Sequence, residues 1–187
     1  MDSRTLIKEC AKNNRGAQKH LYNTYADVML GVCYRYTKNL ADAEDILQEG
    51  FIKVFSRLSQ YKHEAELGAW IRRIMVNASL DYLKKHSRYR TELNFDQVSL
   101  HPVSDENPAI TMDTKDLVEL VRQLPLGYQT VFNLVGIEGF SHAEAGSILG
   151  ISEQTSRSQY SRARATLIKL LNQVSSSVIP QSYVRGI

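Results

Sequence analysis

Six donor-bearing side chains recur along a basic stretch in the C-terminal third of the sequence. They are Gln154, Arg157, Ser158, Ser161, Arg162 and Arg164. At about 100° of rotation per helical residue, four of them project from one side of a helix, and Arg157 and Arg164 flank that side. Amide, hydroxyl and guanidinium groups suit contacts with base edges and phosphates. Because only Glu153 offsets the basic residues, the pattern favours a nucleic-acid-binding face over an ordinary solvated helix.

The elements that must position these side chains have the layout of a helix-turn-helix. Residues 142–149 predict a short helix, and Gly150 then permits the backbone of a sharp turn. Ser152 can cap the following helix, and Glu153 is favourable in its first turn. The apolar face of that second helix is formed by Tyr160, Ala163, Leu167 and Leu171. We therefore expect a recognition helix that lies in a DNA major groove.

A second donor-rich face is expected on a helix from Trp70 to about Ser87. One stripe of this helix is typical of a core and contains Ile71, Ile74, Met75, Ala78 and Tyr82. The other stripe contains Trp70, Arg73, Asn77, Asp81, Lys84 and Arg88. An aromatic ring, an amide and several cations on one side suit single-stranded nucleic acid, through base stacking and backbone neutralisation. A helix packed on two sides, with snorkelling cations, is the alternative.

An acidic cluster begins the helix expected over residues 41–59. Its members are Glu44, Asp45, Gln48 and Glu49, and the apolar stripe behind them is Ile46, Leu47, Gly50, Phe51, Val54, Phe55 and Leu58. Taken alone, these acids are explained by the helix dipole at least as well as by a binding role. Two earlier helices are expected, one ending near Asn13 and one over residues 17–37. The stripe of the latter is Leu21, Tyr25, Val28, Met29, Val32 and Tyr36.

The chain has 187 residues, 43% of them apolar and 23% charged, as in ordinary soluble globular proteins. Residues 89–113 lose helical periodicity and are rich in acidic residues and breakers, which predicts a flexible linker. Helices are expected again over residues 114–124 and 127–137, and a frayed tail after Leu171. The predicted fold is all-α, with two small helical domains joined by a flexible acidic linker, the C-terminal one containing the helix-turn-helix.

Enzymatic chemistry finds little support in the sequence. It contains no HExxH, no phosphate-binding loop and no Cys–His pairing with familiar spacing, so we expect no catalytic residue, metal, cofactor or small-molecule substrate. Cys10 and Cys33 are expected to be free thiols in a reducing cytoplasm. A secretory signal pattern and an apolar run of membrane-spanning length are both absent from the sequence, which favours a cytoplasmic location.

Three motifs in this order resemble one family, the extracytoplasmic-function (ECF) subgroup of bacterial RNA polymerase sigma factors. They are DAEDILQEGFIKVF at 42–55, WIRRIMVNASLDYLKK at 70–85, and LP at 124–125 followed by GFSHAEAGSILGIS and RSQYSRAR. The resemblance implies sigma region 2 over residues 1–88, a linker over 89–113, sigma region 4 over 114–174 and a tail over 175–187.

The same resemblance implies roles for individual residues. The clamp helices of the largest subunit of core RNA polymerase would be contacted by Asp45, Gln48 and Glu49. The −10 element would be melted by Trp70, Arg73, Asn77 and Asp81, and a flipped-out base would be captured near Tyr61, Lys62, His63 and Asn77; Lys84 joins this set from its helix face. The −35 duplex would be read by Arg157, Ser158, Arg162 and Arg164, with Gln154 and Ser161 added from the same face. An anti-sigma factor, often membrane-anchored in the family, is a further expected partner.

Some positions depart from the family pattern. Ser156 stands where a buried valine is usual, and Gln159 replaces a common arginine. Val135 occupies the place of a frequent DNA-contacting arginine, and Tyr160 that of an aliphatic residue. These departures predict an unusual −35 preference and a less tightly packed small domain. The main alternative to a sigma factor is an independent helix-turn-helix regulator with a helical N-terminal dimerisation or ligand domain, which would leave the two-faced Trp70 helix unexplained.

Overall fold

The computed structural model describes residues 3–62, 65–85 and 114–178, and all regular elements in these ranges are helical. The chain divides into two compact units, an N-terminal unit Met1–Ser87 and a C-terminal unit Arg88–Ile187. The predicted all-α class with two helical units is therefore confirmed for the described residues. The expected linker and His63 lie outside those residues, and the functional domain boundaries stay predictions.

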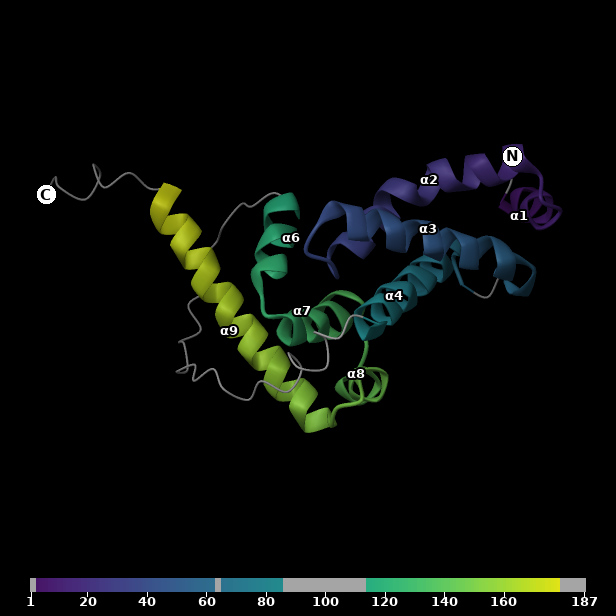
Figure 1. Ribbon diagram of the computed structural model, residues 1–187. Helices are drawn as coiled ribbons and strands as arrows, with labels where there is room; N and C mark the ends of the chain where they lie inside the picture. The colour runs from purple at the N-terminus through teal and green to yellow at the C-terminus, as the bar shows by residue number, and fades with distance from the viewer. Residues whose placement is uncertain (1–2, 63–64, 86–113, 179–187) are drawn as a thin grey trace, which may run out of the picture. The chain divides into compact units, whose positions relative to one another are not determined.

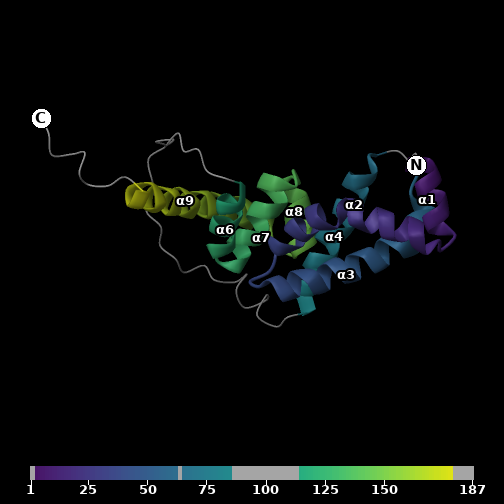
Figure 2. The ribbon, with the colours of Figure 1, turned by 90° about the horizontal axis from the view of Figure 1, so that it is seen from above.

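The N-terminal unit is a helical bundle (Figures 1 and 2). Its elements are α1 (Ser3–Ala11), α2 (Arg15–Tyr34), α3 (Leu40–Arg57), the 3-10 turn η1 (Leu58–Gln60) and α4 (Leu67–Lys85). Helices α2, α3 and α4 each pack against the other two, and α1 packs against α2. The core between them is apolar and includes the fully buried Leu21, Ile46, Val54, Ile71 and Met75.

Asparagine side chains cap the starts of α2 and α3 in this bundle. The backbone N–H of Ala17 donates to Asn14 Oδ1 at 3.1 Å at the start of α2. Asn39 caps α3 in the same way, accepting from the N–H of Asp42 at 2.8 Å. One stripe prediction is wrong: Val28 is 64% exposed, because the packed face of α2 is narrower than the stripe read from the sequence.

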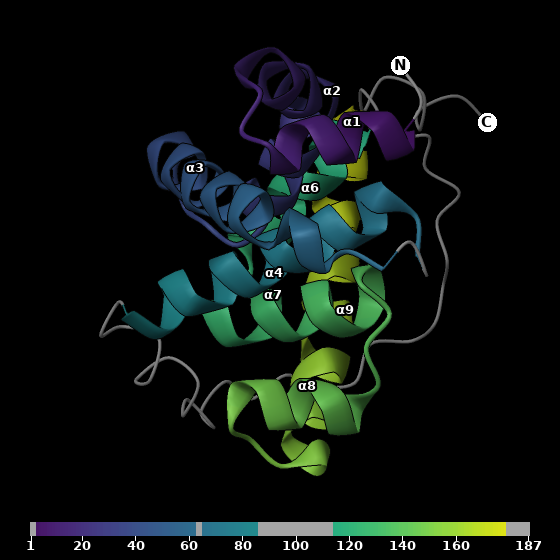
Figure 3. The ribbon, with the colours of Figure 1, turned by 90° about the vertical axis from the view of Figure 1, so that its right-hand side faces the viewer.

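In the C-terminal unit, the described residues 114–178 form five further elements (Figure 3). They are α6 (Thr114–Gln123), α7 (Leu126–Phe132), the π-helical turn η2 (Asn133–Ile137), α8 (His142–Leu149) and α9 (Glu153–Val178). A small apolar cluster holds α6, α7 and α9 together and consists of Leu120, Val121, Leu124, Tyr128, Ala163 and Leu167. The expected fraying after Leu171 is too early, since α9 continues to Val178. In the described ranges, no helix combines the length and apolar character needed to cross a membrane.

Candidate functional site

The helix-turn-helix forms as the sequence predicts, with local hydrogen bonds at each of its corners. Gly150 ends α8 in the left-handed region, with φ 70° and ψ 32°, where glycine avoids the steric cost of a Cβ. Ser152 Oγ accepts from the N–H of Thr155 at 3.0 Å and so caps α9. Ser141 and Glu144 form a capping box at the start of α8, with bonds of 3.2 and 2.8 Å. The Ser-x-x-Glu signature of this box is present in the sequence and could have revealed it.

Helix α9 displays most of the predicted donors on one side. Five of them are exposed, namely Gln154, Arg157, Ser158, Ser161 and Arg164, and Arg162 is half-buried. Ala163 and Leu167, on the opposite side, are buried in the apolar cluster. The exposed side includes a hollow of about 230 Å³ lined by Ser152, Gln154, Thr155, Ser158, Gln159 and Arg162. The structure thus places three of the predicted −35 residues, Gln154, Ser158 and Arg162, around a polar depression, and Arg157, Ser161 and Arg164 lie outside its lining.

Two of these donors are already engaged within the helix. Arg157 is paired with Glu153, whose Oε1 accepts from Nη2 at 2.6 Å and from Nε at 3.1 Å. Both side chains are well exposed, so the pair contributes little to stability and can exchange for another anion. Ser158 donates its hydroxyl proton to the carbonyl of Gln154 at 2.9 Å. While that bond persists, Ser158 can offer only an acceptor to a base edge.

Of the four positions that depart from the family pattern, Ser156 and Gln159 are buried, whereas Val135 and Tyr160 are half-buried. Ser156 is fully buried, and its hydroxyl is 3.0 Å from Nδ1 of His142 on α8. The His142 ring makes an edge contact with Tyr160, which in turn stacks on Phe132, with centroid separations of 5.5 and 5.8 Å. Gln159 is only 6% exposed, so it does not project from α9 as the usual arginine would be expected to. The turn of the helix-turn-helix is therefore fastened by polar and aromatic contacts.

The predicted −10 face is displayed along α4. Arg73, Asn77 and Lys84 are exposed, whereas Trp70 is half-buried. The rings of Trp70 and Tyr61 lie 5.3 Å apart between centroids, so the structure brings these two predicted residues together. Tyr61 donates its hydroxyl proton to the carbonyl of Ala65.

The loop before α4 supplies the rest of the predicted −10 set. Glu66 accepts from the N–H of Ala69 at 3.1 Å, which caps the start of α4. Lys62 is exposed. His63 cannot be assigned a place because it lies outside the described residues.

Two residues near the end of α4 reach back to α3. Asp81 forms an ion pair with Lys53 at 3.0 Å, a contact between helices that the sequence pattern missed. Tyr82, expected in the core, is half-buried. Its burial, followed by its hydrogen bond to Asp42 and the charges of Asp42 and Asp45, raises the pKa of Tyr82 to about 12. Asp81 and Tyr82 thus connect the face expected to melt DNA with the acidic helix.

The acidic helix α3 presents Asp45, Gln48 and Glu49 to solvent. Asp42, one turn earlier, has a structural role, because its carboxylate accepts from the side-chain amide of its capping residue Asn39 at 2.8 Å. Ile52 is 68% exposed on this same side of α3, an apolar side chain that the stripe analysis did not identify as exposed. The predicted polymerase-binding residues therefore share one open face of α3.

The cysteines are buried free thiols, as expected. Burial raises the pKa of Cys33 to about 11 and also raises that of Cys10, so both stay protonated at neutral pH. Among the described residues, no cluster of three or more His, Cys, Asp or Glu side chains could hold a metal ion.

The fold and these faces define a two-unit helical protein built around a DNA-binding helix-turn-helix. Residues 21–89 match the Sigma-70 region 2 family, and residues 114–167 match the Sigma-70, region 4 family. The first match lies almost entirely within the N-terminal unit, and the second lies within the C-terminal unit.

Several relatives carry the name ECF RNA polymerase sigma factor. The ECF RNA polymerase sigma factor SigM of Mycobacterium tuberculosis is 30% identical over 137 residues, which cover 73% of this chain and 68% of that protein. SigE of Mycolicibacterium smegmatis is 34% identical over 160 residues, 83% of this chain and 62% of that protein. SigW of Bacillus subtilis is 27% identical over 176 residues, 88% and 94% respectively.

A solved structure has the same fold: the sigma factor RpoE in complex with the anti-sigma factor NepR from Bartonella quintana. It is 24% identical, with a TM-score of 0.51, and the match covers 82% of this chain and 96% of that one. The chain belongs to the ECF subgroup of RNA polymerase sigma factors. Sigma factors are transcription initiation factors. The family matches and the named relatives favour a sigma factor over an independent helix-turn-helix regulator.

Proposed function

We propose that this chain binds core RNA polymerase and directs initiation at specific promoters, reading the −35 duplex and melting and reading the −10 element. The observation that carries the proposal is the coincidence of two sigma-family matches with two helical units, each displaying its candidate DNA-binding donors on one exposed helix side. The protein would act in the cytoplasm without a cofactor or small-molecule substrate.

The polymerase contact is assigned to Asp45, Gln48 and Glu49. Their exposure on one side of α3 supports the assignment, because acidic and amide groups can meet a basic, donor-rich surface such as the clamp helices of the largest subunit. Complementary charge also speeds the encounter of the two proteins and suppresses wrong partners.

The −10 contact is assigned to the exposed side of α4 and the loop before it. Arg73, Asn77 and Lys84 would hold the backbone and a base edge of the opened strand. The contact between Trp70 and Tyr61 offers an aromatic surface for stacking, which is how proteins hold unpaired bases. Lys62 and His63 complete the proposed set.

The −35 contact is assigned to α9 as the recognition helix. Arg162 beside the hollow and the exposed Arg164 can reach guanine edges or phosphates, and Gln154, Ser158 and Ser161 line the same side. Arg157 would exchange its carboxylate partner for a phosphate. An anti-sigma factor, anchored in a membrane or free, would hold the protein inactive until a signal releases it.

Charge reversal on α3 tests the proposal. Asp45→Lys/Glu49→Lys should abolish binding to core polymerase and run-off transcription from genomic DNA. Thermal stability should fall little, since both positions lie off the buried stripe. The control Glu9→Lys/Glu119→Lys makes the same change in net charge at a half-buried site on α1 and an exposed site on α6. It also breaks the pairs with Lys12 and Arg122, so circular dichroism checks its fold, and it should transcribe normally.

DNA binding by the isolated protein distinguishes a sigma factor from an independent regulator. A tether between two small units costs entropy when both must align, so the lone protein should bind promoter DNA weakly and in a salt-sensitive way. Tight sequence-specific binding without polymerase, or a fully active α3 variant, would overturn the proposal in favour of an independent regulator.

A further inference from the structure

Three side chains follow one another along the hollow on the exposed side of α9. Gln154, Ser158 and Arg162 are spaced four residues apart, so they share one side of the helix, and all three line the hollow. Gln154 lies in the first turn of α9, and the N-terminal residues of a recognition helix are those that contact base edges. Of the three, Gln154 is therefore the side chain best placed to read a base.

The amide of Gln154 is available for a partner. Its side chain is exposed, and within the described residues its amide forms no hydrogen bond. The neighbouring hydroxyls are already engaged, because Ser158 donates to the carbonyl of Gln154 at 2.9 Å. Ser152 and Thr155 are hydrogen-bonded to each other through their hydroxyls at 2.8 Å. The lining of the hollow thus presents one available amide beside hydroxyl groups that are bonded within the helix.

Guanidinium groups are kept away from this end of the hollow. Arg157 lies outside its lining and is paired with Glu153 at 2.6 Å. Arg162 does line the hollow, but about two turns beyond Gln154. Guanine is read best by arginine or lysine, which donate to both its O6 and its N7. The end of the hollow at Gln154 is therefore poorly matched to guanine.

The chemistry of an amide matches a different base. Adenine presents an amino group at N6 and an acceptor at N7 in the major groove, and a glutamine amide binds both at once. Guanine presents two acceptors, so its O6 would repel the amide oxygen. Thymine presents an acceptor and a methyl group, and cytosine presents an amino group, so each can satisfy only one half of the amide.

We propose that Gln154 is a specificity-determining residue that selects adenine at one position of the −35 duplex. Its amide oxygen accepts from the N6 amino group, and its amide nitrogen donates to N7. The inference rests on the proposed function and deepens it, from a helix that reads DNA to the base that one side chain selects.

Run-off transcription with core polymerase tests the assignment, on a wild-type-selected promoter whose −35 element is randomised. The wild type should prefer adenine at one position by about 5- to 150-fold, the discrimination expected of a bidentate contact. Gln154→Ala should lose the preference at that position and keep those at the others. The matched control Gln173→Ala removes an exposed amide farther along α9 and should leave the whole profile unchanged.

Gln154→Glu gives a sharper result, because a carboxylate accepts hydrogen bonds and donates none. The preference at the same position should move from adenine to cytosine, whose N4 amino group donates. Total initiation should fall because a negative charge near the phosphates weakens binding, so the relative base profile is the readout. Circular dichroism checks that each variant stays folded.

The outcomes separate this inference from the proposed function. If the wild type initiates at no promoter with core polymerase, the proposed function is overturned, and the inference with it. If the wild type initiates but Gln154→Ala weakens all −35 sequences equally, Gln154 contacts only the DNA backbone and the inference alone is overturned. A Gln154→Glu variant that still prefers adenine would contradict the inference in the same way.

Discussion

The interiors of the two units differ in how many polar side chains they bury. Among the described residues, five of the seven buried polar side chains lie in the C-terminal unit, namely Gln129, Thr130, Asn133, Ser156 and Gln159. The N-terminal unit buries only Thr37 and Ser79 of this kind, within a core of aliphatic and aromatic side chains. One unit is therefore held mainly by apolar packing, whereas the other depends on a small apolar cluster and on internal hydrogen bonds.

The difference matters because buried polar groups stabilise a fold only when they are bonded. Thr130 donates to the carbonyl of Leu126 at 2.7 Å, and Ser156 meets His142 at 3.0 Å. The first bond lies within α7, whereas the second joins α8 to α9 and, because it is directional, specifies how these two helices meet more narrowly than apolar contacts do. This specificity helps the C-terminal unit to hold the exposed side of α9 in place for DNA. Its apolar cluster is small, however, so few other apolar contacts remain when one is lost.

The largest predicted effect follows from the small apolar cluster of the C-terminal unit. Leu124 is 1% exposed within that cluster, so Leu124→Ala should destabilise the unit by about 2–5 kcal/mol. Urea unfolding followed by far-ultraviolet circular dichroism should show an early transition. Trp70 is the chain's single tryptophan and lies in the N-terminal unit, so its fluorescence transition should not move.

A control on α6, the helix that ends just before Leu124, separates loss of packing from the Leu→Ala change itself. Leu117→Ala makes the identical change at a side chain that is 45% exposed on α6, and should shift stability by less than about 0.5 kcal/mol. If circular dichroism and Trp70 fluorescence shift together in Leu124→Ala, the two units unfold together. Their stabilities could then not be compared separately.

Close packing in the N-terminal unit is tested at Gly50, where α3 approaches α4. A Cβ built at Gly50 would lie 2.2 Å from Sδ of the buried Met75. Gly50→Ala should therefore destabilise the unit by about 1–3 kcal/mol through overpacking, more than the helix gains in propensity. The measurement is urea unfolding followed by Trp70 fluorescence.

Gly31 supplies the matched control. It lies inside α2 with nothing within 4 Å of a built Cβ, so Gly31→Ala should stabilise the same unit by about 0.5–1 kcal/mol. A destabilised Gly31→Ala, or a harmless Gly50→Ala, would mean that helix packing near Met75 adapts more easily than its burial implies.

Local sequence signals predicted most of the helices and the helix-turn-helix. Periodicity located the buried stripe of α3, and Gly150 and Ser152 fixed the turn, because these features depend on residues a few positions apart. The exposed sides of α4 and α9 follow from the same periodicity.

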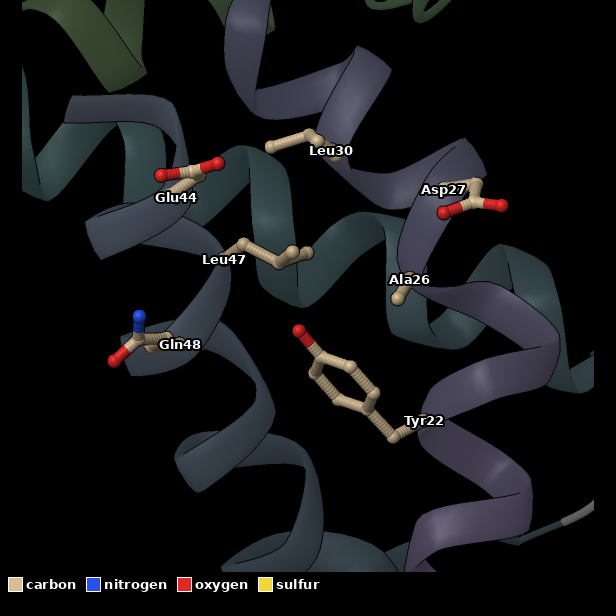
Figure 4. Close-up of a pocket in the computed structure, with 7 residues that line it drawn as sticks. All are labelled: Tyr22, Ala26, Asp27, Leu30, Glu44, Leu47 and Gln48. Atoms are coloured by element: carbon tan, nitrogen blue, oxygen red, sulfur yellow. The ribbon is translucent and has the colours of Figure 1, made fainter. Parts of the chain in front are cut away.

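Contacts between helices could not be read in this way. The pairing of Lys53 with Asp81 spans 28 positions and depends on how α3 crosses α4, which periodicity does not encode. The same holds for the exposure of Val28 and for a hollow of about 320 Å³ beside Gln48, which residues of α2 and α3 line together (Figure 4). The functional role of each exposed residue also depends on its partner, so the assigned sites stay predictions.

A smaller effect tests the polar fastening of the C-terminal unit. Ser156→Ala removes the hydroxyl that meets His142, and should cost about 0.5–1.5 kcal/mol. A double-mutant cycle with His142→Ala should give a coupling energy of similar size, measured by circular dichroism on urea unfolding. Ser161→Ala, at an exposed serine on the same helix, should change nothing measurable. Additive effects at residues 142 and 156 would mean that apolar packing alone fastens α8 to α9.

The smallest effect concerns the one strongly shifted polar group between α3 and α4. Burial and the carboxylates of Asp42 and Asp45 raise the pKa of Tyr82 to about 12, whereas a tyrosine in the unfolded chain has a pKa of about 10. As the pH rises past the lower value, the unfolded chain loses its proton first, so unfolding becomes easier. The contribution of Tyr82 is thus fully present below the unfolded pKa and is lost progressively as the pH approaches 12.

Tyr82→Phe isolates this contribution from the other groups that titrate in alkali. The wild type should lose more stability than Tyr82→Phe between neutral pH and the folded pKa of Tyr82, as measured by the urea midpoint of Trp70 fluorescence. Asp45→Asn should reduce the loss only partly, because the charge of Asp45 ranks below burial and Asp42 among the causes of the raised pKa. Parallel alkaline profiles for the wild type and Tyr82→Phe would show that solvent already reaches the hydroxyl, and that the interface of α3 with α4 depends on apolar packing and the Lys53–Asp81 pair alone.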